Sequence, residues 1–430
     1  MRVVDNDKQI PRIRQRTKPF PGQHLHRQLG VDGVDQHGPD KGATSIGTTT
    51  TTATTTAPSI TRKTSETAIG GGINVLSLGG STTWGSGLES RTESFPGLLL
   101  KEAALVSRSD NLAIRASSAM WPATCLQSLL DQHGLANINY HVVLLEFSIN
   151  GLQGLELLLQ RIRLRFPDSL IIYVDLYSNR TPGFSNCLTE GCKMNPEKQG
   201  ALTDLIKQVG GYALSLPRPK DPMHYDEVLP LFQSDHHHLN ERGHLLVANN
   251  ILPLIRNHAP KTVSTGTWLD GDSCTNWFES GEIPATIQLE GGTMNRFARN
   301  KHAYEITSEQ PVVATFLPNG KPPKATPLML VFMTKGNPSV YPYVQANIEG
   351  QEATVVNPLS KKWADDHVTS THVVGTMGPD DDRLHLKNIE PQKDFPFRLV
   401  GTVMCSACDQ LGFNIHKRCQ QRGCVHSVDD

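Results

Sequence analysis

Between residues 73 and 258, short apolar runs alternate with amphipathic stretches. Runs that begin at Ile73, Tyr140 and Ser169 are apolar nearly throughout, which is typical of strands buried on both faces of a parallel sheet. A further strand is predicted for the segment NLAIRAS, which begins at Asn111. Helices are predicted over residues 94–106, 122–130, 152–166, 197–209 and 242–255. Strands that alternate with helices form right-handed βαβ units, so this region is predicted to be a three-layer α/β/α domain with a parallel sheet.

The pattern changes after Pro260. From residue 267 to residue 403, short runs such as PVVATFL and LMLVFM are separated by clusters of Gly, Pro, Asn and Asp, and helical periodicity is weak. Several short strands with turn signals between them predict a C-terminal β-sandwich-like domain. Residues 404–430 follow as a Cys-rich tail.

Residues 1–70 include a Thr-rich, low-complexity segment with almost no large apolar residues. Such a segment cannot bury enough surface to offset its conformational entropy, so we expect it to be disordered. A flexible linker is the preferred interpretation, and an O-glycosylated extracellular stalk is the alternative. No apolar core of a signal peptide is visible, and Asp5 and Asp7 argue against a transit peptide. The compartment stays open, with secretion as one option.

Overall composition narrows the classes of partner. The formal net charge is -1, which provides no long-range field for nucleic acid, so no nucleic-acid partner is expected. No apolar run reaches the roughly 18 residues that a membrane-spanning helix needs, so no transmembrane segment is predicted.

The first motif with chemical potential is LSLGGSTTWGSG, residues 76–87. An apolar strand runs into Gly79 and Gly80, and Ser81 follows directly. Glycines permit a sharp turn from strand to helix that exposes a serine hydroxyl at the carboxyl end of a parallel strand. Ligands of open α/β sheets bind at that edge. A Gly-Gly-Ser turn without any function is the alternative.

Two further motifs fall at the same predicted edge. In DHHHLNERGH, Asp235 and His238 are three residues apart, a spacing that lets a carboxylate orient an imidazole on a tight turn. Helix capping by Asp235, or a metal site of the three histidines, are the alternatives, although adjacent side chains point in different directions. In LEFSINGL, Asn150 follows a strand, where its amide can donate to an oxyanion or simply form an Asn-Gly turn.

The order of these motifs resembles the SGNH (GDSL-type) hydrolases, a family of esterases, lipases and carbohydrate O-acetyl esterases or transferases. The resemblance covers about residues 73–258. It implies that Ser81 is the nucleophile, His238 the base, Asp235 the acid that orients the base, and Asn150 an oxyanion donor. The block around Ser81 reads GGST instead of GDSL, so Gly80 stands where the family has Asp.

The second conserved sequence block of the family contains a Gly whose backbone N–H donates to the oxyanion. This chain matches that block less well. Ser118 in AIRASSAMWP is the best counterpart, and its N–H could still donate. The resemblance implies covalent acyl transfer, in which His238 takes the proton of Ser81 and the serine attacks an ester carbonyl. No metal or cofactor is expected. The expected substrate is a small-molecule or glycan ester.

Aromatic and cysteine residues add further candidates. Trp84 and Trp121 flank the predicted site in sequence, where core packing is the preferred interpretation over contact with a sugar. Cys187 and Cys192 could form a local disulfide. The tail cysteines are compatible with zinc or with disulfides, and we favour disulfides. They are Cys405, Cys408, Cys419 and Cys424.

The sequence therefore predicts a serine ester hydrolase or O-acyltransferase that acts on an acyl ester, with a carbohydrate as one possible carrier. The alternative is a non-catalytic carbohydrate-binding protein built on the same scaffold, since the second block is altered and β-sandwiches appended to hydrolases often bind glycans. The discriminating geometry is a hydrogen bond between Ser81 Oγ and His238 Nε2, with Asp235 on the other ring nitrogen.

Overall fold

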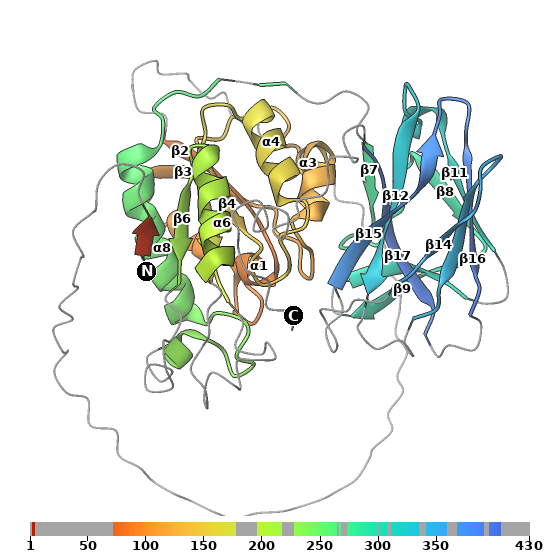
Figure 1. Ribbon diagram of the computed structural model, residues 1–430. Helices are drawn as coiled ribbons and strands as arrows, with labels where there is room; N and C mark the ends of the chain where they lie inside the picture. Colours follow the sequence, from red (N-terminus) through yellow and green to blue (C-terminus); the bar gives the residue numbers. More distant parts are fainter. Residues whose placement is uncertain are drawn as a thin grey trace, which may run out of the picture. The chain divides into compact units, whose positions relative to one another are not determined.

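A computed structural model describes the fold, and its elements are labelled in Figure 1. The described residues are 2–4, 72–177, 196–216, 228–264, 266–267, 273–298, 301–307, 311–334, 341–358, 368–390 and 395–405. The Thr-rich segment, the loop that contains Cys187 and Cys192, and the tail after Cys405 lie outside them. The predictions made for those segments stay predictions.

A parallel sheet forms the first domain. Its parallel strands are β2 (Ile73–Gly79), β3 (Val106–Asn111), β4 (Val142–Glu146), β5 (Leu170–Asp175) and β6 (Tyr212–Ser215). The strand order is β1-β6-β5-β4-β2-β3, so the chain reverses its direction of winding between β2 and β4. Ligands of open α/β sheets bind at the carboxyl ends of the strands beside such a reversal.

Helices cover both faces of this sheet. They are α1 (Ser81–Trp84), α2 (Phe95–Leu99), α3 (Met120–Gln132), α4 (Leu155–Arg165), α6 (Pro196–Gln208) and α8 (Glu241–His258). Alternate residues of β4 separate the two layers. Val143 and Leu145 join the cluster that includes α3, α4 and α6, whereas Val142 and Leu144 join the cluster that includes α2 and α8. The predicted three-layer α/β/α fold is therefore confirmed.

Two predicted elements around residue 106 are wrong. The helix expected over residues 94–106 ends at Leu99, and the second strand is Val106–Asn111 instead of the segment from Asn111 onward. β3 is an edge strand in which Val106 alone is fully buried, so it lacks the apolar run that identifies an inner strand. The short strand β6 was not predicted at all.

The N-terminal residues differ from the expectation of disorder over 1–70. Arg2–Val4 form the strand β1, which pairs antiparallel with β6. β6 would otherwise be the edge of the sheet, where unpaired backbone N–H and C=O groups accept a further strand. The reason for the difference is therefore edge pairing, which is a tertiary effect.

The second domain is a β-sandwich, as predicted, and Figure 1 shows its strands in teal to blue. One sheet has the order β15-β12-β17-β10-β9, with β7 also paired to β17, and the other has the order β14-β13-β16-β11-β8. The strands are β7 (Ser273–Asn276), β8 (Ile287–Glu290), β9 (Thr293–Ala298), β10 (Lys301–Ile306), β11 (Val312–Phe316), β12 (Thr326–Thr334), β13 (Val344–Ile348), β14 (Thr354–Val356), β15 (Val368–Met377), β16 (Arg383–Asn388) and β17 (Phe397–Met404). All described pairings within them are antiparallel.

Side chains on the two faces of β12 pack into two different apolar clusters. Leu328, Leu330 and Phe332 point into the core between the two sheets. Met329 and Val331, on the other face of the strand, belong to the apolar cluster that includes α3 and α4. The sandwich therefore buries one face of its larger sheet against the first domain.

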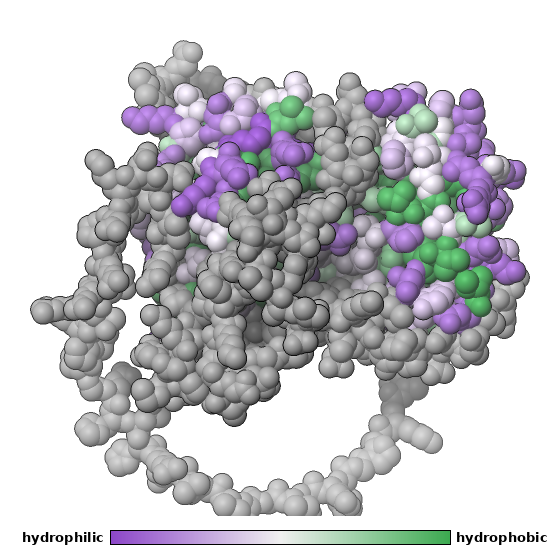
Figure 2. Space-filling model, viewed as in Figure 1, coloured by the Kyte–Doolittle hydropathy of each residue, from purple (hydrophilic) through white to green (hydrophobic). Residues whose placement is uncertain are grey.

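Polar surface and apolar side chains are mixed over the sandwich, as Figure 2 shows. Its exposed large apolar residues are Val355, Val373, Ile389 and Phe395.

Among the helices of the described residues, none is long and apolar enough to cross a membrane.

A disulfide joins the two domains. Cys125 on α3 is bonded to Cys274 on β7, 149 residues later in the chain. Cys405 is disulfide-bonded as well, and its sulfur accepts a hydrogen bond from Arg161 Nη2 at 3.4 Å. The spacing of the cysteines alone did not indicate the bond between Cys125 and Cys274.

Removal of this disulfide is expected to lower stability. A cross-link that closes a loop of this length stabilises by up to about 5 kcal/mol through the entropy of the unfolded chain. We expect Cys125→Ala to lower the melting temperature, measured by differential scanning calorimetry, by several degrees. Since each single variant already loses the bond, Cys125→Ala/Cys274→Ala should be little worse than either one. If the losses in melting temperature of the two single variants added up in the double variant, this account would be wrong.

Candidate active site

The turn that carries Ser81 depends on two glycines. Ser81 is the first residue of α1, directly after β2 and Gly80. A Cβ atom on Gly79 would lie 2.2 Å from Thr83 Oγ1, and one on Gly80 would lie 2.3 Å from Asn150 Nδ2. Both distances are too short for any side chain. The absence of a side chain on Gly80 therefore allows the Asn150 amide to approach the turn before Ser81.

The structure brings three predicted residues into one chain of hydrogen bonds. His238 Nε2 lies 2.9 Å from Ser81 Oγ, and His238 Nδ1 lies 2.5 Å from Asp235 Oδ2. Ser81 and His238 are 157 residues apart in the chain. With Nδ1 protonated toward the carboxylate, Nε2 is free to accept the serine proton.

Hydrogen bonds to the backbone hold Asp235 in place. Its Oδ1 accepts from the backbone N–H groups of His237 at 2.9 Å and His238 at 3.0 Å. Partial burial raises the pKa of Asp235, but these two hydrogen bonds and that of the His238 ring outweigh it and lower the pKa to about 2. Asp235 is therefore ionised at neutral pH and stabilises an imidazolium on His238.

The loop that carries His238 leads directly into α8. Asn240 caps this helix, since its Oδ1 accepts from Gly243 N at 3.1 Å. His238 O accepts from Gln233 N at 2.8 Å, which closes the loop before the cap. His236 has a positive φ of 55°, a left-handed conformation that turns the chain between Asp235 and His238. The ring of His237 contacts that of His238 edge-on, with centroids 4.7 Å apart.

Asn150 lies beside the turn before Ser81, since a Cβ on Gly80 would lie 2.3 Å from its Nδ2. Asn150 Nδ2 donates to Ser117 O at 3.1 Å, and the amide has a second N–H that can donate elsewhere. Ser118 lies next to Gly151, whose φ of 134° turns the chain after Asn150. The segments after β2, β3 and β4 thus meet at one edge, as the sequence predicts.

If Asn150 donates to an oxyanion, as the sequence predicts, Asn150→Ala should lower kcat for hydrolysis of an ester by roughly 10²–10³-fold, because one donor is removed. KM should change little, since that donor acts on the charge that develops in the transition state. Steady-state kinetics with phenyl acetate would measure both values. The matched control is Asn250→Ala on α8, where the amide donates to Leu246 O at 2.8 Å. Equal effects of the two variants would contradict a role of Asn150 in catalysis.

The two tryptophans differ in their surroundings. Trp121 is 1% exposed and packs against Phe278 of the sandwich, with centroids 5.9 Å apart, which agrees with its interpretation as core. Trp84 on α1 is only partly buried, and the guanidinium groups of Arg91 and Arg115 each lie over its ring, at 4.9 and 4.5 Å from the ring centroid. Two cation–π contacts therefore hold the end of the helix that begins with Ser81.

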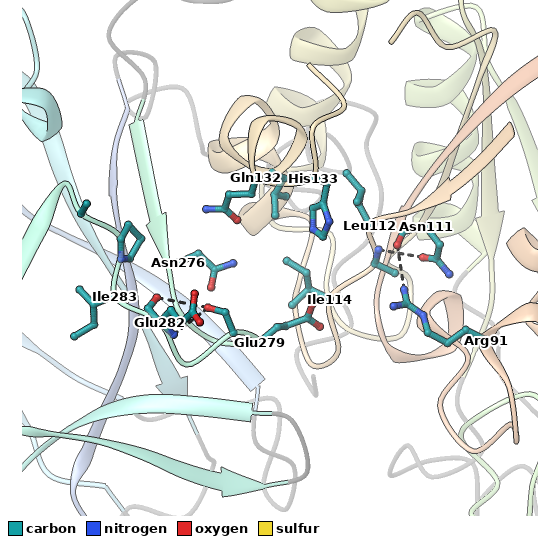
Figure 3. Close-up of a pocket in the computed structure, with 15 residues that line it drawn as sticks. Arg91, Asn111, Leu112, Ile114, Gln132, His133, Asn276, Glu279, Glu282 and Ile283 are labelled. Atoms are coloured by element: carbon teal, nitrogen blue, oxygen red, sulfur yellow. Dashed lines mark hydrogen bonds between the residues drawn. The ribbon is translucent and has the colours of Figure 1, made fainter. Parts of the chain in front are cut away.

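A cavity of about 530 Å³ lies between residues from β3 and α3 on one side and residues that follow β7 on the other (Figure 3). Arg91 lines one side of the cavity and Glu279 lines another. Burial raises the pKa of Glu279, although the charges of Arg91 and Arg115 act to lower it. Asn111, also in its wall, donates from Nδ2 to Thr83 O at 2.7 Å. Ser81 does not line it, so the cavity is a neighbour of the candidate site and is separate from the chemistry.

Comparisons with known proteins support the fold. No family model matches the chain, and no curated protein does. A crystal structure of a two-domain esterase (CEX) active on acetylated mannans matches with a TM-score of 0.51 and 14% identity, over 78% of this chain and 91% of that one. The same esterase co-crystallised with mannopentaose matches with a TM-score of 0.50 and 14% identity, over 78% and 92%. A lipolytic protein of the G-D-S-L family from Desulfitobacterium hafniense covers 42% of this chain at 12% identity, with a TM-score of 0.30. The likeness to the two structures of the CEX esterase shows a shared two-domain fold.

Proposed function

We propose that this protein is a serine ester hydrolase or O-acyltransferase of the SGNH kind. The observation that carries the proposal is the hydrogen-bonded series Ser81–His238–Asp235, with 2.9 and 2.5 Å between the donor and acceptor atoms. Only a nucleophile, its base and the acid that orients the base require this geometry together. A solvated histidine or a capping aspartate would not need to contact a serine 157 residues away.

The reaction follows from the positions of these groups. His238 Nε2 accepts the proton of Ser81 as Oγ forms a bond to the ester carbonyl carbon. The backbone N–H groups of Ser81 and Ser118 and the Asn150 amide donate to the resulting oxyanion. When the carbon–oxygen bond of the ester breaks, His238 gives the proton to the departing alcohol, and an acyl group remains on Ser81.

A second nucleophile completes the reaction. Water, or the hydroxyl of an acceptor, gives its proton to His238 as its oxygen bonds to the acyl carbon. The bond between that carbon and Ser81 Oγ then breaks, and His238 returns the proton to Oγ. Water makes the protein a hydrolase, and an acceptor alcohol makes it a transferase.

An acetylated glycan is the substrate class that we propose. The esterase with the same two-domain fold is described as active on acetylated mannans, which supports testing this class first. The partly exposed side chains of His238 and Asp235, 19% and 26% accessible, are compatible with a site that a bulky polymer can reach.

Labelling with a fluorophosphonate probe tests the proposed function. The probe phosphonylates serines that a neighbouring base activates, so we expect the folded protein to be labelled and Ser81→Ala and His238→Ala to be unlabelled. The labelled protein would then be assayed for acetate release from acetylated mannan and from acetylated xylan. A well-folded protein that the probe does not label would contradict the proposal and favour a binding protein on the same scaffold.

A further inference from the structure

Glu146, the last residue of β4, lies beneath the nucleophile turn and has no part in the reaction above. It is 2% exposed. Thr83 Oγ1 donates to Glu146 Oε2 at 3.1 Å, so the carboxylate contacts the helix that begins with Ser81. Gly80, before α1, has no side chain to accept the free N–H groups of this turn. The Glu146 carboxylate accepts a hydrogen bond from the Thr83 hydroxyl of this turn.

The backbone of Glu146 contacts the same turn. Gly80 N donates to Glu146 O at 3.2 Å. A Cβ on Gly79 would lie 2.9 Å from that oxygen, so the turn approaches β4 as closely as glycine allows. Both the main chain and the side chain of Glu146 therefore set where the residues on either side of Ser81 lie.

Packing alone does not account for a carboxyl group here. Glu146 Oε1 is buried and has no hydrogen-bond partner among the described residues. Burial of an unpaired polar oxygen is costly, whereas an apolar side chain would avoid that cost. The neighbouring positions Val143, Leu144 and Leu145 are apolar and fully buried.

The charge state of Glu146 changes near neutral pH. Burial raises its pKa to about 7, the Asp175 charge acts in the same direction, and the hydrogen bond from Thr83 acts against both. From β5, Asp175 and Tyr173 face it. Burial raises the pKa of Tyr173 well above 10, so the phenol stays neutral, and Ser148 Oγ donates to Asp175 Oδ1 at 2.7 Å.

We propose that Glu146 is a positioning residue whose ionised carboxylate holds the turn from Gly80 to Thr83 so that Ser81 stays aligned with His238. The inference rests on the proposed function, since it needs Ser81 to be the nucleophile. Hydrogen bonds to a carboxylate are roughly twice as strong as those to a neutral acceptor. Protonation of Glu146 therefore loosens the turn without removing any group that touches the substrate.

Glu146→Gln tests this role, because the amide has nearly the same shape but cannot ionise. We expect the ratio of the kcat of the parent protein to that of Glu146→Gln to rise roughly fivefold between pH 6 and pH 8, with KM unchanged. Glu102→Gln, at an exposed carboxyl, is the matched control, and its ratio should be independent of pH.

Hydrogen exchange separates this inference from the proposed function. At pH 8, the peptide that covers residues 79–86 should exchange faster in Glu146→Gln than in the parent protein, whether or not the protein hydrolyses esters. A parent protein that the fluorophosphonate probe does not label would overturn the proposed function while this measurement still reports on the turn. Unchanged exchange, or a kcat ratio that is flat with pH, would overturn the role of Glu146.

Discussion

Ser81→Ala is expected to lower kcat for ester hydrolysis by roughly 10⁶-fold, with the fold intact. The methyl group of alanine offers no nucleophile, and His238 loses the hydroxyl that its Nε2 contacts at 2.9 Å. His238→Ala should cost about as much, because a serine without its base is a weak nucleophile. Since the residues act as a unit, the double variant should be no slower than either single variant.

Steady-state kinetics with phenyl acetate and acetylated mannan would measure this loss, with circular dichroism as the check on folding. Ser107→Ala is the matched control, since Ser107 is an exposed serine on β3 with a hydrogen bond to Asn74 Oδ1 at 3.1 Å. Activity within tenfold of the parent protein in Ser81→Ala would refute Ser81 as the nucleophile.

Asp235→Asn is expected to lower kcat by roughly 10⁴-fold. Asparagine is close in shape to aspartate, and its oxygen can still accept from the backbone N–H of His238. Its NH₂ group, however, would donate to Nδ1 of His238, which places the ring proton on Nε2. The imidazole then faces Ser81 with a proton and cannot accept one.

The pH dependence of the parent protein gives a second check on Asp235. Its folded pKa of about 2 lies below the ordinary value of 3.8, so the charge is present above pH 4 and is lost only as the pH falls through about 2. Asp235 should therefore add no acid limb to kcat/KM between pH 5 and pH 9. If Asp235→Asn retained a tenth of the activity or more, Asp235 would be a capping residue without a catalytic role.

Local pattern was sufficient for most of the fold. Apolar runs identified β2, β4 and β5 because inner strands of a parallel sheet are buried on both faces, and this pattern needs no knowledge of the neighbours. β3 failed this test because it is an edge strand with the polar sequence VSRSDN. The same explanation applies to β1, since a strand that only extends an edge needs backbone hydrogen bonds more than apolar side chains.

The sequence by itself determined the two-domain architecture and the residue types of the candidate site, because Ser81, Asn150, Asp235 and His238 each occur in a short motif at a predicted strand or helix end. Only the tertiary structure decided the distances between them, the link from Cys125 to Cys274 and the surroundings of Glu146. A glutamate at the end of an apolar strand has no local signal that marks it as buried. Its pKa and its contact with the turn depend on Thr83, 63 residues earlier in the chain, and on Asp175 of the next strand. Only the folded chain places these residues beside Glu146.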